Sequence, residues 1–427
     1  MTVDPNHIYN WAKDLFPINR SLTGAGNRKT LKYIKNIIPK MRIINFKSKK
    51  KVFDWEVPYV WNVKSAYICD SNKNRIIDFN KNNLHLVGYS QPVNKKISYK
   101  KLIRHLHYLK KQPDAIPYIT SYYKKYWGFC LSYNQFKKLN KNKNYYVCIQ
   151  SSFTRGFMNV GEILIKGKSE KEILLSTNIC HPSMGNNELS GLVTTMAIAK
   201  YLQSKKNLNY SYRVLFLPET IGSISYINKH LKELKKNTIG GLNIVCTGDE
   251  GRFSFLPSKY QDSLFEEIAL QTLKNNVKKF KKYSFLERGS DERQYCSPGV
   301  NLPVCSIMKS KYGNYEEYHT SLDNLDFISA KGLGSSYKLI KIFLDNFDYT
   351  KIYISTKICE PFLSKYGLYP TISDKKSFQK TKLIKNILTY CDGSNDVFRI
   401  SKLVGEKRQT VIKVLKMLKE KNLIKQL

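Results

Sequence analysis

The alternation of short apolar runs with helix-like stretches between about residues 151 and 350 limits the possible folds of this chain more than any other feature. The runs EILLST, YRVLFLPE and GLNIVCTG are separated by stretches such as LVTTMAIAKYLQ and SYINKHLKELKK. Such runs are typical of strands buried on both faces, and strands that alternate with helices form βα units. The pattern predicts an α/β domain with a largely parallel sheet covered by helices on both faces.

The flanking segments follow other patterns and predict the remaining domains. Residues 1–50 read as two helices, which we assign to the same α/β domain as residues 151–350. Residues 51–150 contain short alternating runs rich in Val, Tyr, Phe and Trp, so we predict an inserted all-β domain there. Pro and Gly recur in residues 351–374, a predicted linker, and residues 375–427 read as three helices of a helix-turn-helix module.

Composition limits the class of protein and its expected compartment. The chain has 427 residues, 42% of them hydrophobic, which is enough for packed cores. No run approaches the roughly 20 apolar residues that cross a bilayer. The N-terminus MTVDPNHIYNWAKDLF lacks the basic and apolar segments of a secretory signal. The nine cysteines include no C-x-x-C pair. We therefore expect a cytoplasmic protein with reduced thiols and no structural zinc ribbon.

The net charge of +39 has two interpretations. It is typical of proteins with an anionic partner, such as nucleic acid, an acidic glycan or anionic lipid. It also follows from compositional drift, because Lys, Asn, Ile and Tyr are all abundant and the basic residues are spread along the whole chain. Charge alone does not identify a partner.

Polar and ionisable side chains recur where the predicted strands of residues 151–350 end. In chain order they are His181, Asn187, Glu188, Glu219, Asp249, Asp291 and His319. Because the carboxyl ends of parallel strands meet at one edge of a sheet, we expect these side chains to line one cleft. Two histidines with several carboxylates are also a common ligand set for zinc.

Several long segments resemble one known family in the same order along the chain. They include LFPINRSLTGAGNRKTL, VFDWEVPYVWNV, LHLVGYSQPV, QPDAIPYITSYYKKYWGFCLS, ETIGSISYI, GSDERQYCSPGVNLPV, EYHTSLDNLDFI and EPFLSKYGLYPT. The sequence is similar to bacterial aminopeptidase-like proteins of the M28 zinc-peptidase type that carry an inserted β domain and a C-terminal winged helix. Such proteins are associated with polysaccharide biosynthesis. The resemblance implies a mixed sheet flanked by helices and a zinc-dependent peptide or amide hydrolase.

The resemblance also implies roles for individual residues. His181, Asp249 and His319 match metal ligands, and Glu219 matches the general base that activates a metal-bound water. Asn187, followed by Glu188, stands where the family has a bridging Asp in a D-N-L-S-G context. A further ligand carboxylate is replaced by Thr220.

These two departures bear on the number of metal ions. An amide oxygen brings no charge to offset the repulsion between two dications, which favours one zinc over two and leaves a metal-free cleft open. With one zinc, the ligands come from His181, Asp249, His319, Glu188 and Asn187. Candidate substrate-binding residues are Asp291, Arg293 and Tyr318.

The C-terminal module has a candidate recognition helix. Its N-terminal end carries Lys407, Arg408, Gln409 and Lys413, where such helices meet base edges or phosphates. Winged helices also serve as protein-interaction modules.

Three functions are therefore open. The first is a zinc hydrolase acting on a peptide-like or amino-sugar substrate. The second is a catalytically inactive protein of the same fold that binds such a ligand. The third is a DNA-binding regulator that senses it.

Overall fold

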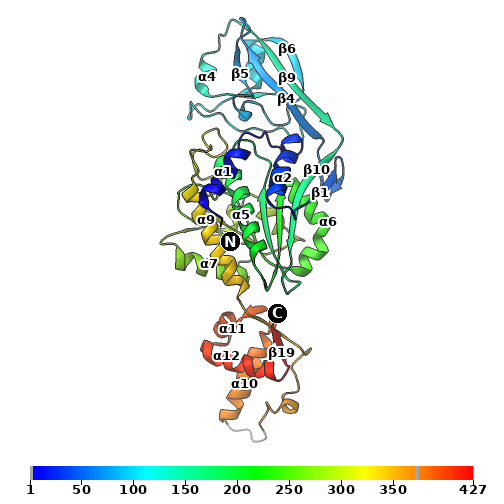
Figure 1. The fold of residues 1–427 in the computed structure, drawn as a ribbon, viewed down its shortest axis with the longest axis vertical. Coiled ribbons are helices and arrows are strands. Elements are labelled where there is room, and N and C mark those ends of the chain that lie inside the picture. Colours follow the sequence, from blue (N-terminus) through cyan, green and yellow to red (C-terminus); the bar gives the residue numbers. More distant parts are fainter. Residues whose placement is uncertain (1–2, 371–374, 427) are drawn as a thin grey trace.

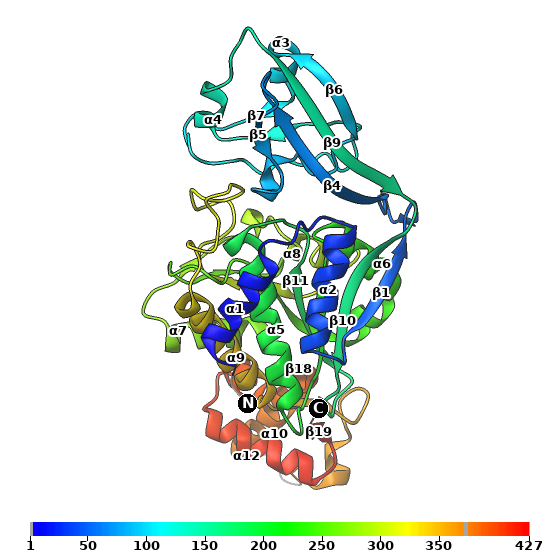
Figure 2. The same cartoon turned by 45° about the horizontal axis from the view of Figure 1, so that its top comes forward.

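The computed structural model describes residues 3–370 and 375–426 and shows three parts arranged along one axis (Figure 1). An α/β body lies in the middle, a β-rich insert at one end and the C-terminal module at the other. Figure 2 shows the long strands of the insert running toward β1 and β10 of the body. Over the described residues, no helix has both the length and the apolar character needed to cross a membrane.

The body is built on an eight-stranded mixed sheet in the order β1-β10-β12-β11-β13-β16-β14-β15. The pairs β12–β11, β11–β13, β13–β16 and β14–β15 are parallel. The pairs β1–β10, β10–β12 and β14–β16 are antiparallel. The strand bounds are Arg42–Lys47 (β1), Phe157–Ile165 (β10), Glu172–Asn178 (β11), Ser211–Leu217 (β12), Thr238–Asn243 (β13), Ser254–Leu256 (β14), Lys281–Lys282 (β15) and Val304–Met308 (β16).

Helices cover both faces of this sheet, which is why every residue of β11 and β12 is buried. Successive residues point to opposite faces, so Ile173 and Leu175 pack in one apolar cluster and Leu174 in another. The predicted α/β class is confirmed, in the mixed form that the resemblance implies. The helices are Pro5–Leu15 (α1), Ala25–Ile37 (α2), Ser190–Ser204 (α5), Ile221–Asn237 (α6), Leu264–Asn276 (α7), Glu292–Tyr295 (α8) and Ala330–Asp348 (α9).

The insert contains an antiparallel sheet in the order β5-β4-β9-β6. Its strands are Val60–Cys69 (β4), Arg75–Asp78 (β5), Val93–Ser98 (β6) and Asn144–Thr154 (β9). A hairpin of Lys51–Val52 (β2) and Trp55–Glu56 (β3) contacts α6 of the body. A short parallel pair, Leu106–His107 (β7) and Phe129–Cys130 (β8), and two short helices, Tyr99–Leu102 (α3) and Tyr133–Lys137 (α4), complete the segment.

The C-terminal module has strands that the sequence analysis did not predict. Its elements are Ile352–Ser355 (β17), Lys375–Thr389 (α10), Asp392–Asp396 (β18), Val397–Val404 (α11), Arg408–Glu420 (α12) and Ile424–Gln426 (β19). These strands form a three-stranded sheet in the order β18-β17-β19. Part of the expected linker therefore belongs to the module, because β17 pairs with both other strands. Residues 371–374 of that expected linker lie outside the described residues.

One buried arginine ties the sheet of the body to α6. Arg213 of β12 is 1% exposed and donates two hydrogen bonds to Glu172 of β11, at 2.8 and 3.0 Å. It also donates to Glu162 of β10 at 3.1 Å and to the Tyr226 hydroxyl of α6 at 2.7 Å. A single guanidinium thus compensates two buried carboxylates on the two strands that flank β12.

Replacing this arginine tests how far the body depends on the cluster. Arg213→Ala leaves Glu172 buried without its counter-ion and Glu162 with only the exposed Arg42, and we expect it to lower the free energy of unfolding by about 3–5 kcal/mol. Urea unfolding followed by circular dichroism measures the loss. The control is Arg42→Ala, since Arg42 pairs with the same Glu162 from a side chain that is 67% exposed. The control should cost less than about 1 kcal/mol, and equal losses in the two variants would contradict the assignment.

Candidate active site

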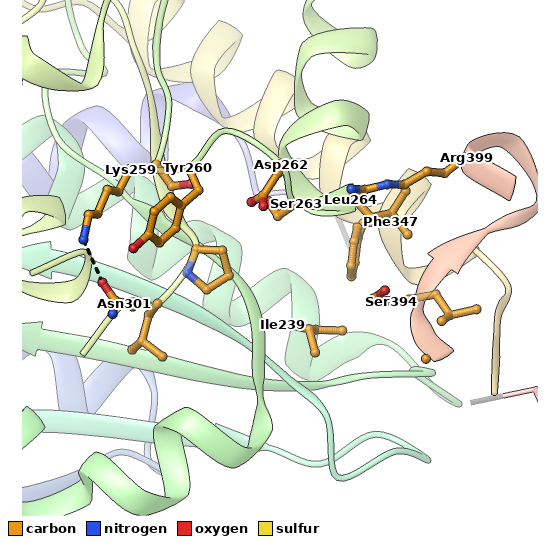
Figure 3. Close-up of a pocket in the computed structure, with 15 residues that line it drawn as sticks. Ile239, Lys259, Tyr260, Asp262, Ser263, Leu264, Asn301, Phe347, Ser394 and Arg399 are labelled. Atoms are coloured by element: carbon orange, nitrogen blue, oxygen red, sulfur yellow. Dashed lines mark hydrogen bonds between the residues drawn. The ribbon is translucent and has the colours of Figure 1, made fainter. Parts of the chain in front are cut away.

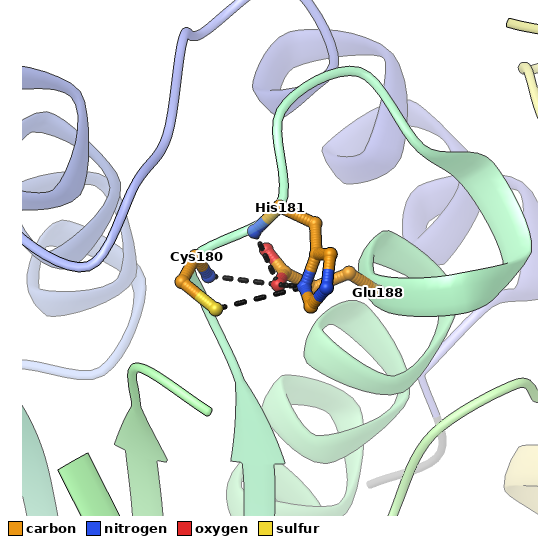
Figure 4. Close-up of side chains that lie close together, drawn as sticks. All are labelled: Cys180, His181 and Glu188. Atoms are coloured by element: carbon orange, nitrogen blue, oxygen red, sulfur yellow. Dashed lines mark hydrogen bonds and ion pairs between the residues drawn. The ribbon is translucent and has the colours of Figure 1, made fainter. Parts of the chain in front are cut away.

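His181 lies in the loop between β11 and α5, where its ring is held by a carboxylate. The loop continues into one turn of π-helix, Gly185–Leu189, and Glu188 of that turn reaches back to the loop. One Glu188 oxygen accepts hydrogen bonds from the backbone N–H of Cys180 (2.7 Å) and of His181 (2.5 Å) and lies 2.6 Å from His181 Nδ1 (Figure 4). The second ring nitrogen, Nε2, is left to face the cleft.

The other Glu188 oxygen meets a buried arginine from the N-terminal segment. Arg20 Nε donates to it over 3.1 Å, and neither side chain is exposed. Burial alone would raise the pKa of Glu188, but His181 and Arg20 together lower it. Burial would likewise lower the pKa of His181, and the charge of Glu188 raises it overall. Glu188 is therefore the centre of a compensated charge network.

Cys180, His181 and Glu188 are near enough to one another to suggest a metal site, since their ligand atoms lie within 4.8 Å. Both Glu188 oxygens, however, already accept hydrogen bonds. Burial raises the pKa of the Cys180 thiol well above its usual value, and its sulfur accepts from the backbone N–H of Glu219 at 3.2 Å. We therefore interpret this cluster as the support of His181.

A cavity of about 400 Å³ opens in front of His181 Nε2, between the body and the insert. Its walls combine aromatic side chains with a few charged ones. The lining residues are Leu22, Trp55, Tyr118, Thr120, Tyr122, Tyr123, Cys180, His181, Glu219, Thr220, Ile221, Arg293, Gln294 and His319.

His319 and Glu219 face this cavity together with His181. The ring centres of the two histidines are 5.5 Å apart, and the carboxylate of Glu219 lies 3.7 Å from His181 Nε2. Burial, followed by the nearby His181, lowers the pKa of His319 to about 3, so its imidazole is neutral. Burial raises the pKa of Glu219, although His181 and Arg293 oppose the shift.

The predicted substrate residues lie around Thr220, at the turn between β12 and α6. Asp291 accepts from the backbone N–H of Thr220 and from the Ser223 hydroxyl, both at 2.8 Å. Burial and the charge of Glu219 raise the pKa of Asp291 to about 7. Arg293 donates to the Thr220 hydroxyl at 2.5 Å and lines the cavity, so it occupies the position from which a substrate can be bound.

Two other predicted residues play supporting parts. Asp291 does not line the cavity and holds the turn in place. The ring of Tyr318 stacks on that of His319, with centres 3.9 Å apart. Tyr318 therefore supports the ring of His319 and does not itself line the cavity.

Two predicted metal ligands, Asp249 and Asn187, do not lie with His181, His319 and Glu219 at the cavity. Asp249 accepts from the Ser310 hydroxyl at 2.5 Å and from the backbone N–H of Gly251 at 3.0 Å, and it is not among the cavity-lining residues. Asn187 donates its backbone N–H to Asp323 at 2.9 Å, and its side-chain nitrogen lies 3.7 Å from the sulfur of Met184. Burial raises the pKa of Asp323 to about 6.

Two groups of residues at the site were not predicted from the sequence. One is Arg20, which lies in the motif LFPINRSLTG but carried no assigned role. The other is the aromatic wall from the insert, in which the ring of Tyr118 lies 5.2 Å from the rings of both His181 and His319. Tyr118, Tyr122 and Tyr123 all fall in the segment AIPYITSYY, so a run of tyrosines in a loop was the available signal.

The two histidines are spaced as two ligands of one zinc ion would be. Two imidazoles on one tetrahedral zinc place their ring centres about 5 Å apart, given zinc–nitrogen bonds of about 2.0–2.1 Å. The observed 5.5 Å between His181 and His319 agrees with this value. A second ion would need a bridging carboxylate, and Asn187 supplies only a neutral amide.

A second cavity, of about 380 Å³, lies where the C-terminal module meets the body (Figure 3). It is lined by Asp262 and Phe347 of the body and by Ser394 and Arg399 of the module. None of the predicted catalytic, metal-binding or substrate-binding residues lines it.

Comparison with known proteins finds two family models and several relatives. A model described as a domain of unknown function, DUF4910, matches residues 9–350, and a winged helix-turn-helix model matches residues 351–426. A candidate polysaccharide biosynthesis protein with an aminopeptidase-like domain, from Clostridium acetobutylicum, is 42% identical over 92% of this chain and 90% of its own length.

Solved structures show the same architecture. A crystal structure of a candidate peptidase from Clostridium acetobutylicum is 40% identical, covers 99% of this chain and 96% of that chain, and has a TM-score of 0.81. A zinc aminopeptidase from Bacillus subtilis is 12% identical, covers 81% of this chain and 95% of that one, and has a TM-score of 0.59. At 12% identity this likeness shows the fold, which is the predicted M28-type fold.

The charge network behind His181 can be tested by removing its centre. Glu188→Gln leaves the guanidinium of Arg20 buried without a counter-ion, and we expect a loss of about 3–5 kcal/mol in the free energy of unfolding. Adding Arg20→Met to this variant should recover most of the lost free energy of unfolding, because no unpaired charge remains. Urea unfolding measures both variants.

The matched control is Glu250→Gln. Glu250 also pairs with a cation, Lys331, but in an exposed ion pair. That change should cost less than about 1 kcal/mol. A similarly small cost for Glu188→Gln, or no recovery in the double variant, would show that the network does not support the loop.

Proposed function

The chain belongs to the DUF4910 family, joined to a winged helix-turn-helix domain, and on that basis we propose that it is an aminopeptidase-like hydrolase that cleaves an amide bond with the help of one zinc ion. One observation carries the proposal. His181 Nε2, the neutral ring of His319 and the Glu219 carboxylate face the same cavity, while Glu188 fixes the other nitrogen of His181.

In this proposal His181 and His319 hold the zinc, which when bound polarises the amide carbonyl and acidifies a water molecule. Glu219 is the general base that accepts the proton of that water. Its raised pKa suits the role, because a carboxylate in a dry site has a greater affinity for the proton than one in water. Arg293 and the Thr220 hydroxyl bind polar groups of the substrate beside it.

The proposed substrate is a peptide-like or amino-sugar amide. The cavity has an aromatic wall, and two of its rings, Trp55 and Tyr123, are 41% and 54% exposed. Both line the cavity and pack edge to face, with ring centres 6.0 Å apart. Exposed aromatic side chains of this kind offer flat apolar faces to a sugar ring or an acyl chain. A link to polysaccharide biosynthesis is supported by the name of the Clostridium acetobutylicum relative.

A binding protein of the same fold is the alternative. It is supported by the neutral Asn187 and by Thr220 in place of a ligand carboxylate. For either function we propose the cytoplasm, since all nine cysteines are free and eight of them are buried.

A separate role in DNA contact is supported by the exposed end of α12. Lys407, Arg408, Gln409 and Lys413 are all exposed, whereas Val411 and Leu415 of the same helix are buried against the module. This arrangement leaves the basic face of the helix available to a phosphate backbone.

Metal content and turnover test the hydrolase. Purified protein should hold about one zinc per chain, and His181→Ala and His319→Ala should each lose it in elemental analysis. Glu219→Gln should keep the zinc and lower hydrolysis of amino-acid anilides or N-acyl amino sugars by about 10²–10⁴-fold. The control Asp249→Asn should keep its zinc. Protein that stays metal-free when zinc is supplied would leave the binding-protein alternative.

Salt dependence tests the DNA contact. The Arg408→Ala/Lys413→Ala variant should bind duplex DNA more weakly, and the slope of log affinity against log salt should fall by about two. Fluorescence anisotropy at several salt concentrations measures the slope. The control is Lys110→Ala/Lys111→Ala, which removes the same charge from the insert. Equal effects of the two variants would indicate attraction by overall charge and no docking of α12.

A further inference from the structure

A third cavity lies in the insert and shares no residue with the cavity at His181. It has a volume of about 660 Å³ and opens beside the turn between β4 and β5 and the start of β9. These strands belong to the end of the molecule opposite the C-terminal module (Figure 1).

The strand register places basic and aromatic side chains in one row across the sheet. Cys69 of β4 pairs with Arg75 of β5 and with Tyr146 of β9, and Tyr146 pairs in turn with Lys96 of β6. Directly paired residues point to the same face of a sheet. Tyr67 lies two residues before Cys69 on this face, and the guanidinium of Arg75 sits 4.1 Å from the centre of its ring.

The opposite face of the same strands carries the core of the insert. Ala66, Ile68, Val147 and Ile149 are all buried, at 2% exposure or less. The row of basic and aromatic residues therefore lies on the outer face, where Tyr146 keeps 38% of its surface exposed. An outer sheet face with exposed rings provides a flat surface on which a ligand can lie.

Two turns add positive charge to the rim of the cavity. Lys73 from the β4–β5 turn and Lys143 from the turn before β9 join Lys96 among the lining residues. None of these three ammonium groups forms an ion pair with any residue that the structure describes. Asp70 also lines the cavity, but its carboxylate accepts backbone N–H groups of its own turn at 2.9 Å.

We propose that this cavity binds an anionic sugar, and the proposal is independent of the hydrolase. The sugar ring lies on the exposed ring of Tyr146, and its phosphate or carboxylate meets Lys73, Lys96 and Lys143. Lysine binds such groups as a compact point charge. The volume falls within the range of about 300–1,000 Å³ typical of small-ligand sites. Single-stranded nucleic acid uses a groove that tracks several nucleotides, so a cavity bounded by two turns favours the sugar.

Calorimetry on the full chain tests the proposal with two anionic probes. Glucose 6-phosphate and glucuronate supply the phosphate and the carboxylate, and glucose is the neutral control. We expect at least one anionic probe to bind and glucose not to bind. Which of the two binds identifies the anionic group.

Variants then locate the site. Lys96→Ala/Lys143→Ala should lower the affinity for the anionic probe roughly tenfold or more, since two charge-assisted contacts are lost. Tyr146→Ala should weaken it too, through the lost stacking. Lys100→Ala/Lys101→Ala removes the same charge from exposed positions on α3 that do not line the cavity, and it should leave binding unchanged.

Three results would overturn the proposal. The first is no heat from either anionic probe with wild-type protein. The second is equal loss of binding in the two double-lysine variants, which would indicate general charge attraction. The third is tighter binding of a single-stranded oligonucleotide that Lys96→Ala/Lys143→Ala abolishes, which would make the site a nucleic-acid site. Unchanged circular dichroism spectra show that the variants are folded.

Discussion

The ion pair between Arg20 and Glu188 joins parts of the chain that are 168 residues apart and has no contact with water. A buried carboxylate is costly unless its lone pairs are all used, and Glu188 uses them on an arginine, two backbone amides and a histidine ring. The loop after β11, the π-helical turn before α5 and the N-terminal segment are thereby fixed to one another. The position of His181 depends on all three.

The sequence was most informative where burial is complete. β11 and β12 are buried along their whole lengths, so they read as unbroken apolar runs and predict a covered sheet. The edge strand β1 has only one fully buried residue in six, and no apolar run marks it. β17 is four residues long and forms by pairing with β18 and β19. Both partners are distant in sequence, so the local residue pattern does not predict this strand.

The candidate site was predicted in part for the same physical reason. His181 and Glu219 follow buried parallel strands, and such strands end at a common edge. Asp249 also follows an apolar segment and His319 lies in a long loop after β16, yet the structure brings only His319 to the cavity. Asp249 is engaged by Ser310, which is distant in sequence and gave no sign of that contact. The aromatic wall comes from the insert. The prediction was based on the strand ends of the body, so it could not include these residues.

The charge network depends on the position of the acidic residue in the turn before α5. In the D-N-L-S-G context the carboxylate stands at the first of these positions, whereas here it stands at the second, as Glu188. Successive residues of a helical turn point in different directions, so moving the carboxylate by one residue turns it away from the place of a bridging ligand. In this chain it faces Arg20 and the Nδ1 side of His181. The turn thus keeps its negative charge and uses it to orient the ring of His181.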